Sequence, residues 1–422
     1  MMLHPLHPTL YENPVLPYDY KAWYANYTWV HKQPFPLWLI AISYKVFGVS
    51  EFATRIPSIL LSSLSIIFTF LICANLFDKK KAILAAWFHA TNGLIIETAA
   101  GRVSTDHYDC IFLVLIELAI WLVLIFEKKE KYWHVVFSAI MIAVAVLTKW
   151  LPAFIIYPIW VTLILYFNKG ATITSLIKKK LPIIFLHFLI VLFIAGSWQL
   201  FIIINFPKES LWEYKHNILH ITSVLDNQQA SWYYYVEKLS ITCNEFFLIV
   251  MCYVVYKVIK EKGERLVYTT LLVWIIIPLL FFSFAQTKMQ AYILFVFPGV
   301  FILIADFFYN IKSNQTSKWS NTCMVFLKIL IICLPLRYSI ERLKIFEDYD
   351  RNPKWVEDLK KIKNKYPTDK TIIFNYPKPI EAMFYTGYTV YNQLPDSQYL
   401  AKIKSNGCNI LIYSSKNTYK EY

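Results

Sequence analysis

The residues of this chain that could carry chemistry lie in one of two sets of loops between its apolar segments. They are acids, histidines and lysines, namely Asp106, Asp109, His31, Lys32, Lys149, Lys288, His216 and Asp226. Carboxylates can take a proton or orient a hydroxyl group, and cations can bind phosphate groups. If the apolar segments zigzag across a bilayer, all these residues face one aqueous compartment. This arrangement favours an active site at one membrane surface over a pore.

Two of the acids stand three residues apart where an apolar segment begins. Asp106 and Asp109 can therefore lie on one side of the first turn of a helix. Helix capping explains one acid at such a position. Two acids beside His107 exceed that need, and acids near a membrane are costly. We predict that Asp106 and Asp109 are catalytic.

Four cationic or imidazole side chains are candidates for binding a phosphate group. His31 and Lys32 are adjacent, just before the apolar segment 34–47, where they suit a phosphate or pyrophosphate headgroup at the membrane surface. Lys149 and Lys288 are lone cations in otherwise apolar hairpins. The alternative for the lysines is an interfacial side chain that reaches for water.

The long loop 206–237 combines rings, amides and an acid. Its candidates are His216, Asp226, Gln228, Trp232 and Tyr233. Sugar faces pack on aromatic rings, and sugar hydroxyls bond to amides and carboxylates. The loop therefore indicates a sugar- or acceptor-binding region, although an interfacial aromatic belt explains its composition equally well.

The composition places the chain in the membrane class. Of its 422 residues, 57% are hydrophobic and only 17% are charged, with a mean hydropathy of +0.43. The formal net charge of +14 would suggest nucleic acid in a soluble protein. Here loop lysines that set orientation and contact anionic lipid explain it, so we expect membrane lipids and no nucleic acid as partners.

Ten segments are long enough to span a bilayer. They are residues 55–76, 82–98, 107–126, 133–147, 151–167, 181–205, 241–256, 267–284, 291–309 and 322–338. The loops after every second span carry sixteen lysines and arginines against five in the others. The positive-inside rule places the lysine-rich loops in the cytoplasm and the candidate residues outside.

Three regions follow from this pattern. Residues 1–54 are expected to form an extracytoplasmic loop with an interfacial helix at 34–47, and residues 55–338 the transmembrane domain. Residues 339–422 read as a soluble α/β cap with helices at 355–365, 379–386 and 397–404 and strands at 371–376, 389–392 and 409–413. The predicted fold class is an all-α polytopic membrane protein of about ten transmembrane helices with interfacial helices and a small extracytoplasmic α/β domain.

The ordered set of motifs resembles the integral-membrane glycosyltransferases of the GT-C type. The branch is the one with bacterial aminoarabinose transferases of lipid A and protein O-mannosyltransferases. The motifs are His31-Lys32-Gln33-Pro34, the segment Glu51 to Ser58, Asp106, Leu147-Thr148-Lys149 and the segment Lys288 to Pro298, with Tyr292 between. They cover roughly residues 10–310 in the family's order, and the set is more specific than any single motif.

The resemblance implies transfer of a sugar from a polyprenyl-phosphate donor to a lipid, glycan or protein acceptor. The reaction would take place on the outer face of a bacterial inner membrane. Members of the family begin with a transmembrane helix that is followed by an Asp-Glu pair. This sequence has neither, because Met1 already lies within the segment that resembles the loop after that helix. An upstream start or a truncated, inactive chain is therefore expected. Asp226-Asn227-Gln228 also departs from the family's Asp-Gly-His motif. His216 or His220 could take the place of the motif's histidine. Whether the protein uses a divalent cation is left open by the sequence.

The alternatives to an enzyme are a binding scaffold and, with less support, a transporter. A transporter would need acids or broken helices near the middle of the bilayer in two related halves. The apolar segments show few ionisable groups and no repeat. The one-sided arrangement of polar residues and the soluble cap favour the enzyme.

Overall fold

The computed structural model describes residues 2–21, 27–103, 107–225, 228–311, 318–347, 353–363, 365–414 and 418–422. The chain forms two compact units. The cap unit joins Met1–His31, Phe206–Glu213 and Phe346–Tyr422. The helical unit joins Lys32–Asn205 and Tyr214–Ile345.

The helical unit consists of helices linked by short connections. The α-helices are α1 (Pro34–Phe47), α2 (Glu51–Leu76), α3 (Lys79–Ala90), α4 (Gly93–Ala100), α5 (Tyr108–Lys129), α6 (Tyr132–Lys149), α7 (Ile156–Phe167), α8 (Ile173–Asn205), α10 (Tyr234–Thr242), α11 (Phe247–Lys260), α12 (Arg265–Phe284), α13 (Phe297–Asn310) and α14 (Lys318–Leu343). Two 3-10 helices, η1 (Leu151–Ile155) and η2 (Gln290–Val296), precede α7 and α13. Helix α9 (Pro207–Thr222) begins in the cap unit and ends in the helical unit.

Seven helices in the described part of the chain are long and apolar enough to span a membrane: α2, α5, α6, α8, α12, η2 with α13, and α14. Helices α10 and α11, bent by 102° at their junction, can form an eighth span. All ten predicted ranges contain helix, but four are divided. Residues 241–256 include the end of α10 and the start of α11, and residues 291–309 form η2 and α13. Residues 82–98 form α3 and α4, and residues 151–167 form η1 and α7. The predicted polytopic helical class is confirmed.

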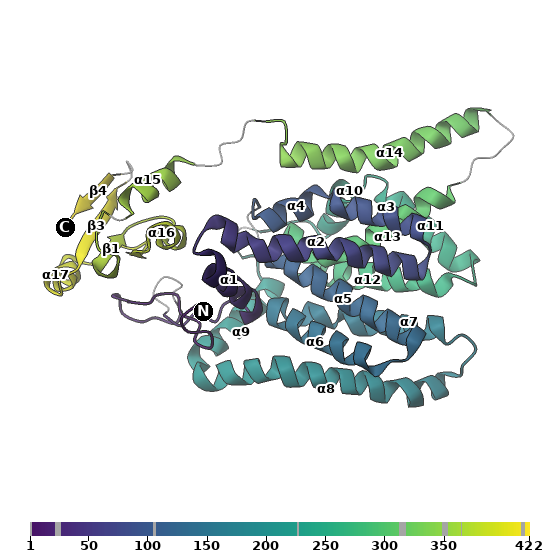
Figure 1. Cartoon of the computed structure of the whole chain (residues 1–422), viewed down its shortest axis with the longest axis horizontal. Coiled ribbons are helices and arrows are strands. Elements are labelled where there is room, and N and C mark those ends of the chain that lie inside the picture. Colours follow the sequence, from purple (N-terminus) through teal and green to yellow (C-terminus); the bar gives the residue numbers. More distant parts are fainter. Residues whose placement is uncertain are drawn as a thin grey trace. The chain divides into compact units, whose positions relative to one another are not determined.

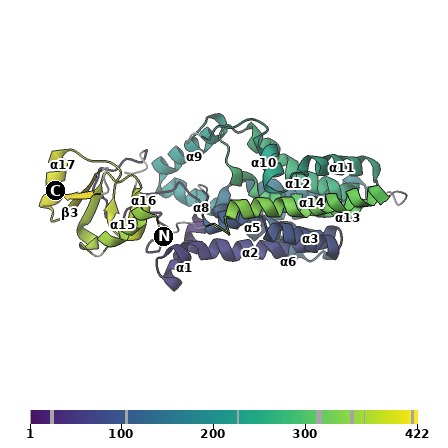
Figure 2. The same cartoon turned by 90° about the horizontal axis from the view of Figure 1, so that it is seen from above.

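Burial distinguishes the central helices from the peripheral ones. The apolar stretches of α5 and of η2 with α13 are 89% buried, whereas those of α8 and α14 are 22% and 17% buried. Phe193 of α8 and Phe326 of α14 are examples of large exposed side chains on the peripheral helices. Such apolar faces would be unfavourable in water and are typical of lipid contact. Helices α2, α5 and α6 run along a common direction (Figures 1 and 2).

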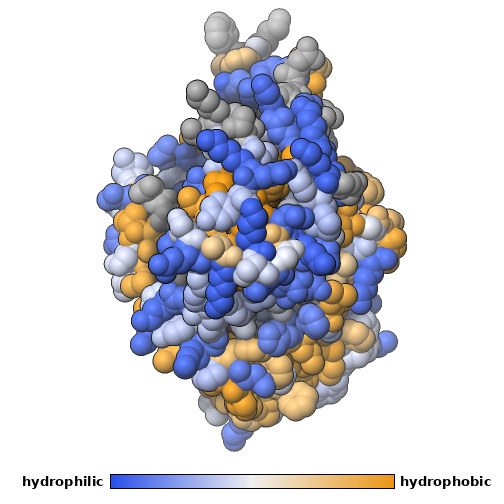
Figure 3. All heavy atoms as spheres, turned by 90° about the vertical axis from the view of Figure 1, so that its left-hand side faces the viewer, coloured by the Kyte–Doolittle hydropathy of each residue, from blue (hydrophilic) through white to orange (hydrophobic). Residues whose placement is uncertain are grey.

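Polarity also varies over the surface. The side of the molecule seen in Figure 3 is largely hydrophilic, with hydrophobic residues gathered toward its edges. In the helical unit, we call the end with the starts of α2 and α5 and the end of α6 the lysine-poor end. The opposite end, with Asp78 and the starts of α3 and α6, is the lysine-rich end.

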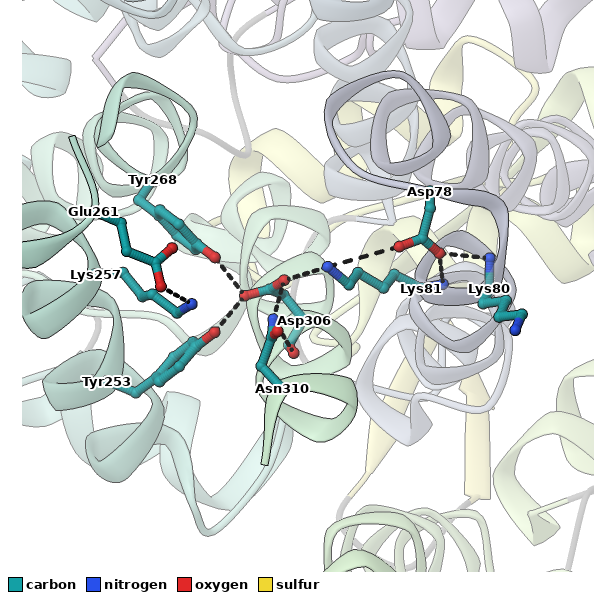
Figure 4. A network of polar contacts seen from close by, with 9 residues as sticks. All are labelled: Asp78, Lys80, Lys81, Tyr253, Lys257, Glu261, Tyr268, Asp306 and Asn310. Atoms are coloured by element: carbon teal, nitrogen blue, oxygen red, sulfur yellow. Dashed lines mark hydrogen bonds and ion pairs between the residues drawn. The ribbon is translucent and has the colours of Figure 1, made fainter. Parts of the chain in front are cut away.

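A buried carboxylate ties helices together at the lysine-rich end (Figure 4). Asp306 of α13 is fully buried. Its oxygens accept hydrogen bonds from the hydroxyls of Tyr253 (2.9 Å) and Tyr268 (3.0 Å), which belong to α11 and α12. The Asn310 amide donates at 2.8 Å, and the Lys81 ammonium of α3 lies 2.8 Å away. The charge on Asp306 is therefore both paired and hydrogen-bonded, as a buried charge requires.

The cap unit contains a four-stranded sheet. Its strands are β1 (Thr371–Phe374), β2 (Thr389–Val390), β3 (Asn409–Ser414) and β4 (Thr418–Glu421), in the order β2-β1-β3-β4. Strand β1 pairs in parallel with β2 and β3, and β4 is antiparallel to β3. The helices are α15 (Lys354–Ile362), α16 (Pro379–Thr386) and α17 (Ser397–Ser405), with a 3-10 turn η3 (Thr368–Lys370). The three predicted strands and three predicted helices are present, whereas β4 was not predicted.

The N-terminal segment completes the core on one face of this sheet. Alternate residues of a strand face opposite sides, so Ile372 and Phe374 contribute to one hydrophobic cluster and Ile373 to the other. Tyr11 and Leu16 belong to the first cluster. The Tyr11 ring stacks on Tyr391 with centroids 4.8 Å apart, and burial raises the pKa of the Tyr11 phenol. The N-terminal segment is thus part of the cap unit.

Candidate functional site

Asp109 and Lys149 form an ion pair at the lysine-poor end. Asp109 lies in the first turn of α5, and Lys149 is the last residue of α6. Consecutive helices joined by a short connection run antiparallel, so the start of α5 lies beside the end of α6. The two residues are far apart in the sequence, and this hairpin of α5 and α6 places them next to each other. Two of the residues chosen from the sequence are therefore brought together.

Helix electrostatics contribute to this pair. An acid at the N-terminus of a helix and a cation at a C-terminus both complement the helix dipole. Trp150 follows with a φ of 65° and a ψ of −143°, a conformation outside the helical region that ends α6 at Lys149. The carboxylate is nearly buried, whereas the side chain of Lys149 keeps 20% of its surface exposed. The lysine is thus the accessible member of the pair.

Tyr292 provides a third side chain at this point. The Lys149 ammonium lies 4.9 Å from the centroid of the Tyr292 ring, a cation–π distance. Tyr292 belongs to η2 and packs against Phe282 of α12, with centroids 5.5 Å apart. The lysine is held between a carboxylate and an aromatic face. The cation is therefore positioned by three separate parts of the helical unit.

Lys288 and Gln228 lie where the long loop docks on the connection between α12 and η2. The Lys288 backbone amide donates to the Gln228 carbonyl at 3.0 Å, and Gln229 forms a β-bridge with Thr287. The Thr287 hydroxyl donates to the Ser223 carbonyl at 2.9 Å. The buried Lys288 ammonium donates to the Ala285 carbonyl at 2.6 Å. In this arrangement Lys288 holds the end of α12 and fixes the loop.

The other predicted residues lie in several places. His31 Nδ1 is 2.9 Å from the Glu213 carboxylate in the cap unit. Lys32 is partly buried at the beginning of the helical unit. The His216 ring makes an edge contact with His220, with centroids 5.6 Å apart.

The aromatic pair of the long loop is at the surface. Trp232 is 76% exposed and Tyr233 is 50% exposed. Both rings are accessible to a ligand or to lipid headgroups. Asp106 and Asp226 lie outside the described residues.

Three further polar residues at the lysine-poor end were not predicted as site residues. Glu97 of α4 forms an ion pair with Arg342 of α14. Arg55 of α2 packs so closely on Gly101 that a Cβ there would lie 2.0 Å from the guanidinium carbon. Glu97 could have been found as an acid inside an apolar segment, since such acids are rarely without a role. The pairing with Arg342 depends on tertiary packing.

Comparison with known proteins supports the resemblance. Residues 31–198 match the family model described as dolichyl-phosphate-mannose-protein mannosyltransferase. An undecaprenyl phosphate-alpha-4-amino-4-deoxy-L-arabinose arabinosyl transferase of Pseudomonas savastanoi pv. phaseolicola is 26% identical over 286 residues, which are 65% of this chain and 50% of that protein. An uncharacterised protein of Aquifex aeolicus is 25% identical over 313 residues, 74% of this chain and 59% of its own. The chain thus spans about half to three-fifths of the length of these relatives.

Solved structures share the fold. ArnT from Cupriavidus metallidurans, bound to undecaprenyl phosphate, superposes with a TM-score of 0.65 at 14% identity, covering 98% of this chain and 92% of ArnT. The Archaeoglobus fulgidus oligosaccharyltransferase in its apo form gives a TM-score of 0.61 at 13% identity, covering 93% and 63% of the two chains. In its fold and in its sequence relatives, the chain is similar to integral-membrane glycosyltransferases of the GT-C type, as its motifs predicted.

Proposed function

We propose that this protein transfers a sugar from a polyprenyl-phosphate donor to a lipid, glycan or protein acceptor. The observation that carries the proposal is the position of Lys149. Its ammonium is partly exposed and is held by Asp109 and Tyr292 at the end where the family motifs meet. One relative is named for a donor in which undecaprenyl phosphate carries aminoarabinose, and a cation in the position of Lys149 would suit the phosphate of such a donor.

The chemistry needs a carboxylate on one side of the sugar and cations on the other. The acceptor oxygen forms a bond to the anomeric carbon as the bond from that carbon to the phosphate oxygen breaks. A carboxylate, for which Asp106 is our candidate, accepts the proton of the acceptor hydroxyl. Lys149 stabilises the negative charge that grows on the leaving phosphate, and Asp109 orients Lys149.

The lysine-poor end faces the outside of the cell in this proposal. The loops at the other end carry most of the lysines and arginines, which remain in the cytoplasm by the positive-inside rule. The named aminoarabinose transferase relatives are bacterial, which supports the inner membrane of a bacterium as the location. The polyprenyl chain would lie along the exposed apolar helix faces, and its phosphate at the membrane surface.

The test uses the full chain in proteoliposomes that contain a bacterial lipid extract. The donor is undecaprenyl phosphate-linked aminoarabinose, and the measured quantity is the rate at which undecaprenyl phosphate is released from it. We expect Asp106→Asn to lower the rate by a factor of about 10² to 10⁴, the contribution of a general base. Lys131→Gln, which removes an exposed lysine at the lysine-rich end, serves as the control and should leave the rate unchanged.

Two results would contradict the proposal. One is equal rates for the wild type and Asp106→Asn, which would remove Asp106 from the chemistry. The other is no release from aminoarabinose- or mannose-linked donors by the wild type, which would favour a binding scaffold. Circular dichroism of both variants verifies that the helical fold is kept.

A further inference from the structure

A carboxyl group lies in the middle of α5, one of the most buried helices of the helical unit. Glu117 follows Tyr108, the first residue of α5, by nine residues and precedes Lys129, the last, by twelve. At a rise of about 1.5 Å per residue, it is about 14 Å from the start of the helix and about 12 Å along the axis from Asp109. Its side chain is completely buried. An ionisable residue at the centre of a membrane span is costly and is rarely present without a function.

Glu117 is joined to two neighbouring helices by a chain of hydrogen bonds. One of its oxygens, Oε1, contacts the hydroxyl of Thr69 on α2. The same hydroxyl lies 2.6 Å from Nδ1 of His89 on α3, and Nε2 of that ring lies 2.9 Å from the hydroxyl of Ser65 on α2. The Ser65 hydroxyl donates to the Ser62 carbonyl at 2.8 Å. The chain therefore connects α5, α2 and α3 through buried side chains.

The hydrogen atoms available to this chain determine its directions. The Ser65 hydroxyl donates its only hydrogen to the Ser62 carbonyl, so its oxygen must accept the hydrogen of Nε2. A neutral His89 ring then has no hydrogen on Nδ1, which accepts the hydrogen of the Thr69 hydroxyl. A hydrogen must also lie between the Thr69 oxygen and Oε1, and it can come only from a protonated Glu117. All contacts of the chain are satisfied when Glu117 is a neutral acid.

One other arrangement satisfies the same contacts. If the proton moves to His89, the ring donates from both nitrogens, and Thr69 donates to a Glu117 carboxylate. This arrangement contains the same number of protons but creates two opposite charges, with Nδ1 and Oε1 4.0 Å apart. The second carboxylate oxygen, Oε2, has no hydrogen-bond partner among the described residues. A charged oxygen without a partner is far more costly in apolar surroundings than a neutral one, so the neutral acid is favoured.

The other ionisable groups around α5 are engaged elsewhere. His89 is the only basic group within salt-bridge distance of Glu117 in the described part of the chain. On the α6 side of α5, His187 of α8 contacts Ser138 rather than the acid. The thiol of Cys110, two turns earlier on α5, has its own acceptor on α4. The acids at the two ends of α5 pair with lysines of α6 and α8: Asp109 with Lys149, and Glu127 with Lys180.

We propose that Glu117, Thr69, His89 and Ser65 form an intramembrane proton-binding site. Its ligand is a single proton, which is held on Glu117 and shared through Thr69 with His89. A glutamate in water is ionised at neutral pH, so the helical unit takes up this proton when it folds. Because the three helices meet through these side chains, the proton stabilises the junction of α2, α3 and α5. The site is independent of the proposed transferase chemistry, and each can fail without the other.

The location of the proton is tested by infrared spectroscopy of the full chain in a detergent that has no carbonyl groups. A protonated carboxyl group has a carbonyl stretch that is separate from the bands of peptide bonds and carboxylates. We expect this band to lose one component in Glu117→Gln at neutral pH. Thr69→Val should keep that component and shift its frequency, because the acid loses its acceptor. The matched control is Glu245→Gln, which removes a partly exposed acid that pairs with Arg337 and should leave the band unchanged.

The uptake of the proton is tested by unfolding in a denaturing detergent at a series of pH values. The glutamine of Glu117→Gln can donate an amide hydrogen to Thr69 as the acid does, so this variant should fold. Unfolding of the wild type releases one proton, and a rise in pH therefore favours its unfolded state. The ratio of the wild-type unfolding constant to that of Glu117→Gln should rise about tenfold per pH unit from about pH 6 upward, until the folded wild type loses the proton. Below about pH 4 the ratio should become constant, because the unfolded glutamate is then protonated as well.

Three results would overturn the proton site. The first is an acid band that is identical in the wild type and Glu117→Gln, which would show that Glu117 carries no proton. The second is an unfolding ratio that does not change with pH, which would show that folding takes up no proton at this position. The third is an unchanged band frequency in Thr69→Val, which would exclude the assigned hydrogen bond even if Glu117→Gln does not fold.

Discussion

Replacing Lys149 with glutamine tests the proposed donor site most directly. The substitution keeps most of the side-chain volume and removes the charge. The ammonium lies 4.9 Å from the Tyr292 ring centroid and pairs with Asp109, whose side chain is 4% exposed. The variant therefore loses a cation at the surface and leaves a nearly buried carboxylate without this partner.

The two losses have separate magnitudes. A hydrogen bond to a charged group contributes about 1.5–3 kcal/mol, so affinity for undecaprenyl phosphate should fall about 10- to 150-fold. Removing one partner of a buried ion pair destabilises the folded state by about 3–5 kcal/mol. The variant Asp109→Asn/Lys149→Gln also removes the carboxylate charge that Lys149 neutralises. It should recover most of the stability but none of the affinity.

The assay combines binding of undecaprenyl phosphate in mixed micelles with unfolding by a denaturing detergent. Lys131→Gln is again the control for loss of a lysine charge. If the double variant binds undecaprenyl phosphate as well as the wild type, Lys149 serves only to neutralise Asp109, and our reasoning about the donor phosphate is refuted.

Two further substitutions test which contacts stabilise each unit internally. Asp306→Ala should destabilise the helical unit by about 3–5 kcal/mol in the same unfolding assay because it removes the acceptor of the Tyr253 and Tyr268 hydroxyls and leaves the Lys81 ammonium with Asp78 alone. Lys81→Met/Asp306→Ala should cost less than the single change, and an equal or larger cost would contradict the assigned pair. In the cap unit, Tyr11→Ala removes a buried ring and should cost about 3–5 kcal/mol, seen as faster proteolysis of the cap. Tyr11→Phe, which loses only a 3.3 Å hydrogen bond to the Val390 carbonyl, should stay close to the wild type.

The helices could be predicted because apolar length is a strong and local signal. The division of residues 82–98 was missed because it depends on one side chain. Asn92 accepts a hydrogen bond from the Ile95 amide and so caps α4, while its own amide group donates to the Thr242 carbonyl at 2.7 Å. The second contact comes from a distant helix. Hydropathy averaged over a span does not contain this information.

The site was predicted in part for a similar reason. Asp109 and Lys149 stand out in the sequence as charges at the ends of apolar segments, and the hairpin of α5 and α6 makes their meeting a simple consequence. Tyr292 could be named from its motif, but its contact with Lys149 depends on where η2 packs. Arg342 appears in the sequence as an ordinary basic residue after the last span. Only the approach of α14 to Gly93 places it beside Glu97.

The docking of the N-terminal segment on the sheet has a consequence for biosynthesis. Tyr11 and its partner Val390 are 379 residues apart. At about 5–20 residues per second, a ribosome needs about 20 to 75 s to make the intervening chain. Throughout that interval the apolar side chains of the first segment have no sheet to cover, while the spans enter the membrane one after another. Because the N-terminal segment is enclosed only after the strands of the sheet have been made, a chaperone that binds short apolar stretches would have tens of seconds in which to bind it.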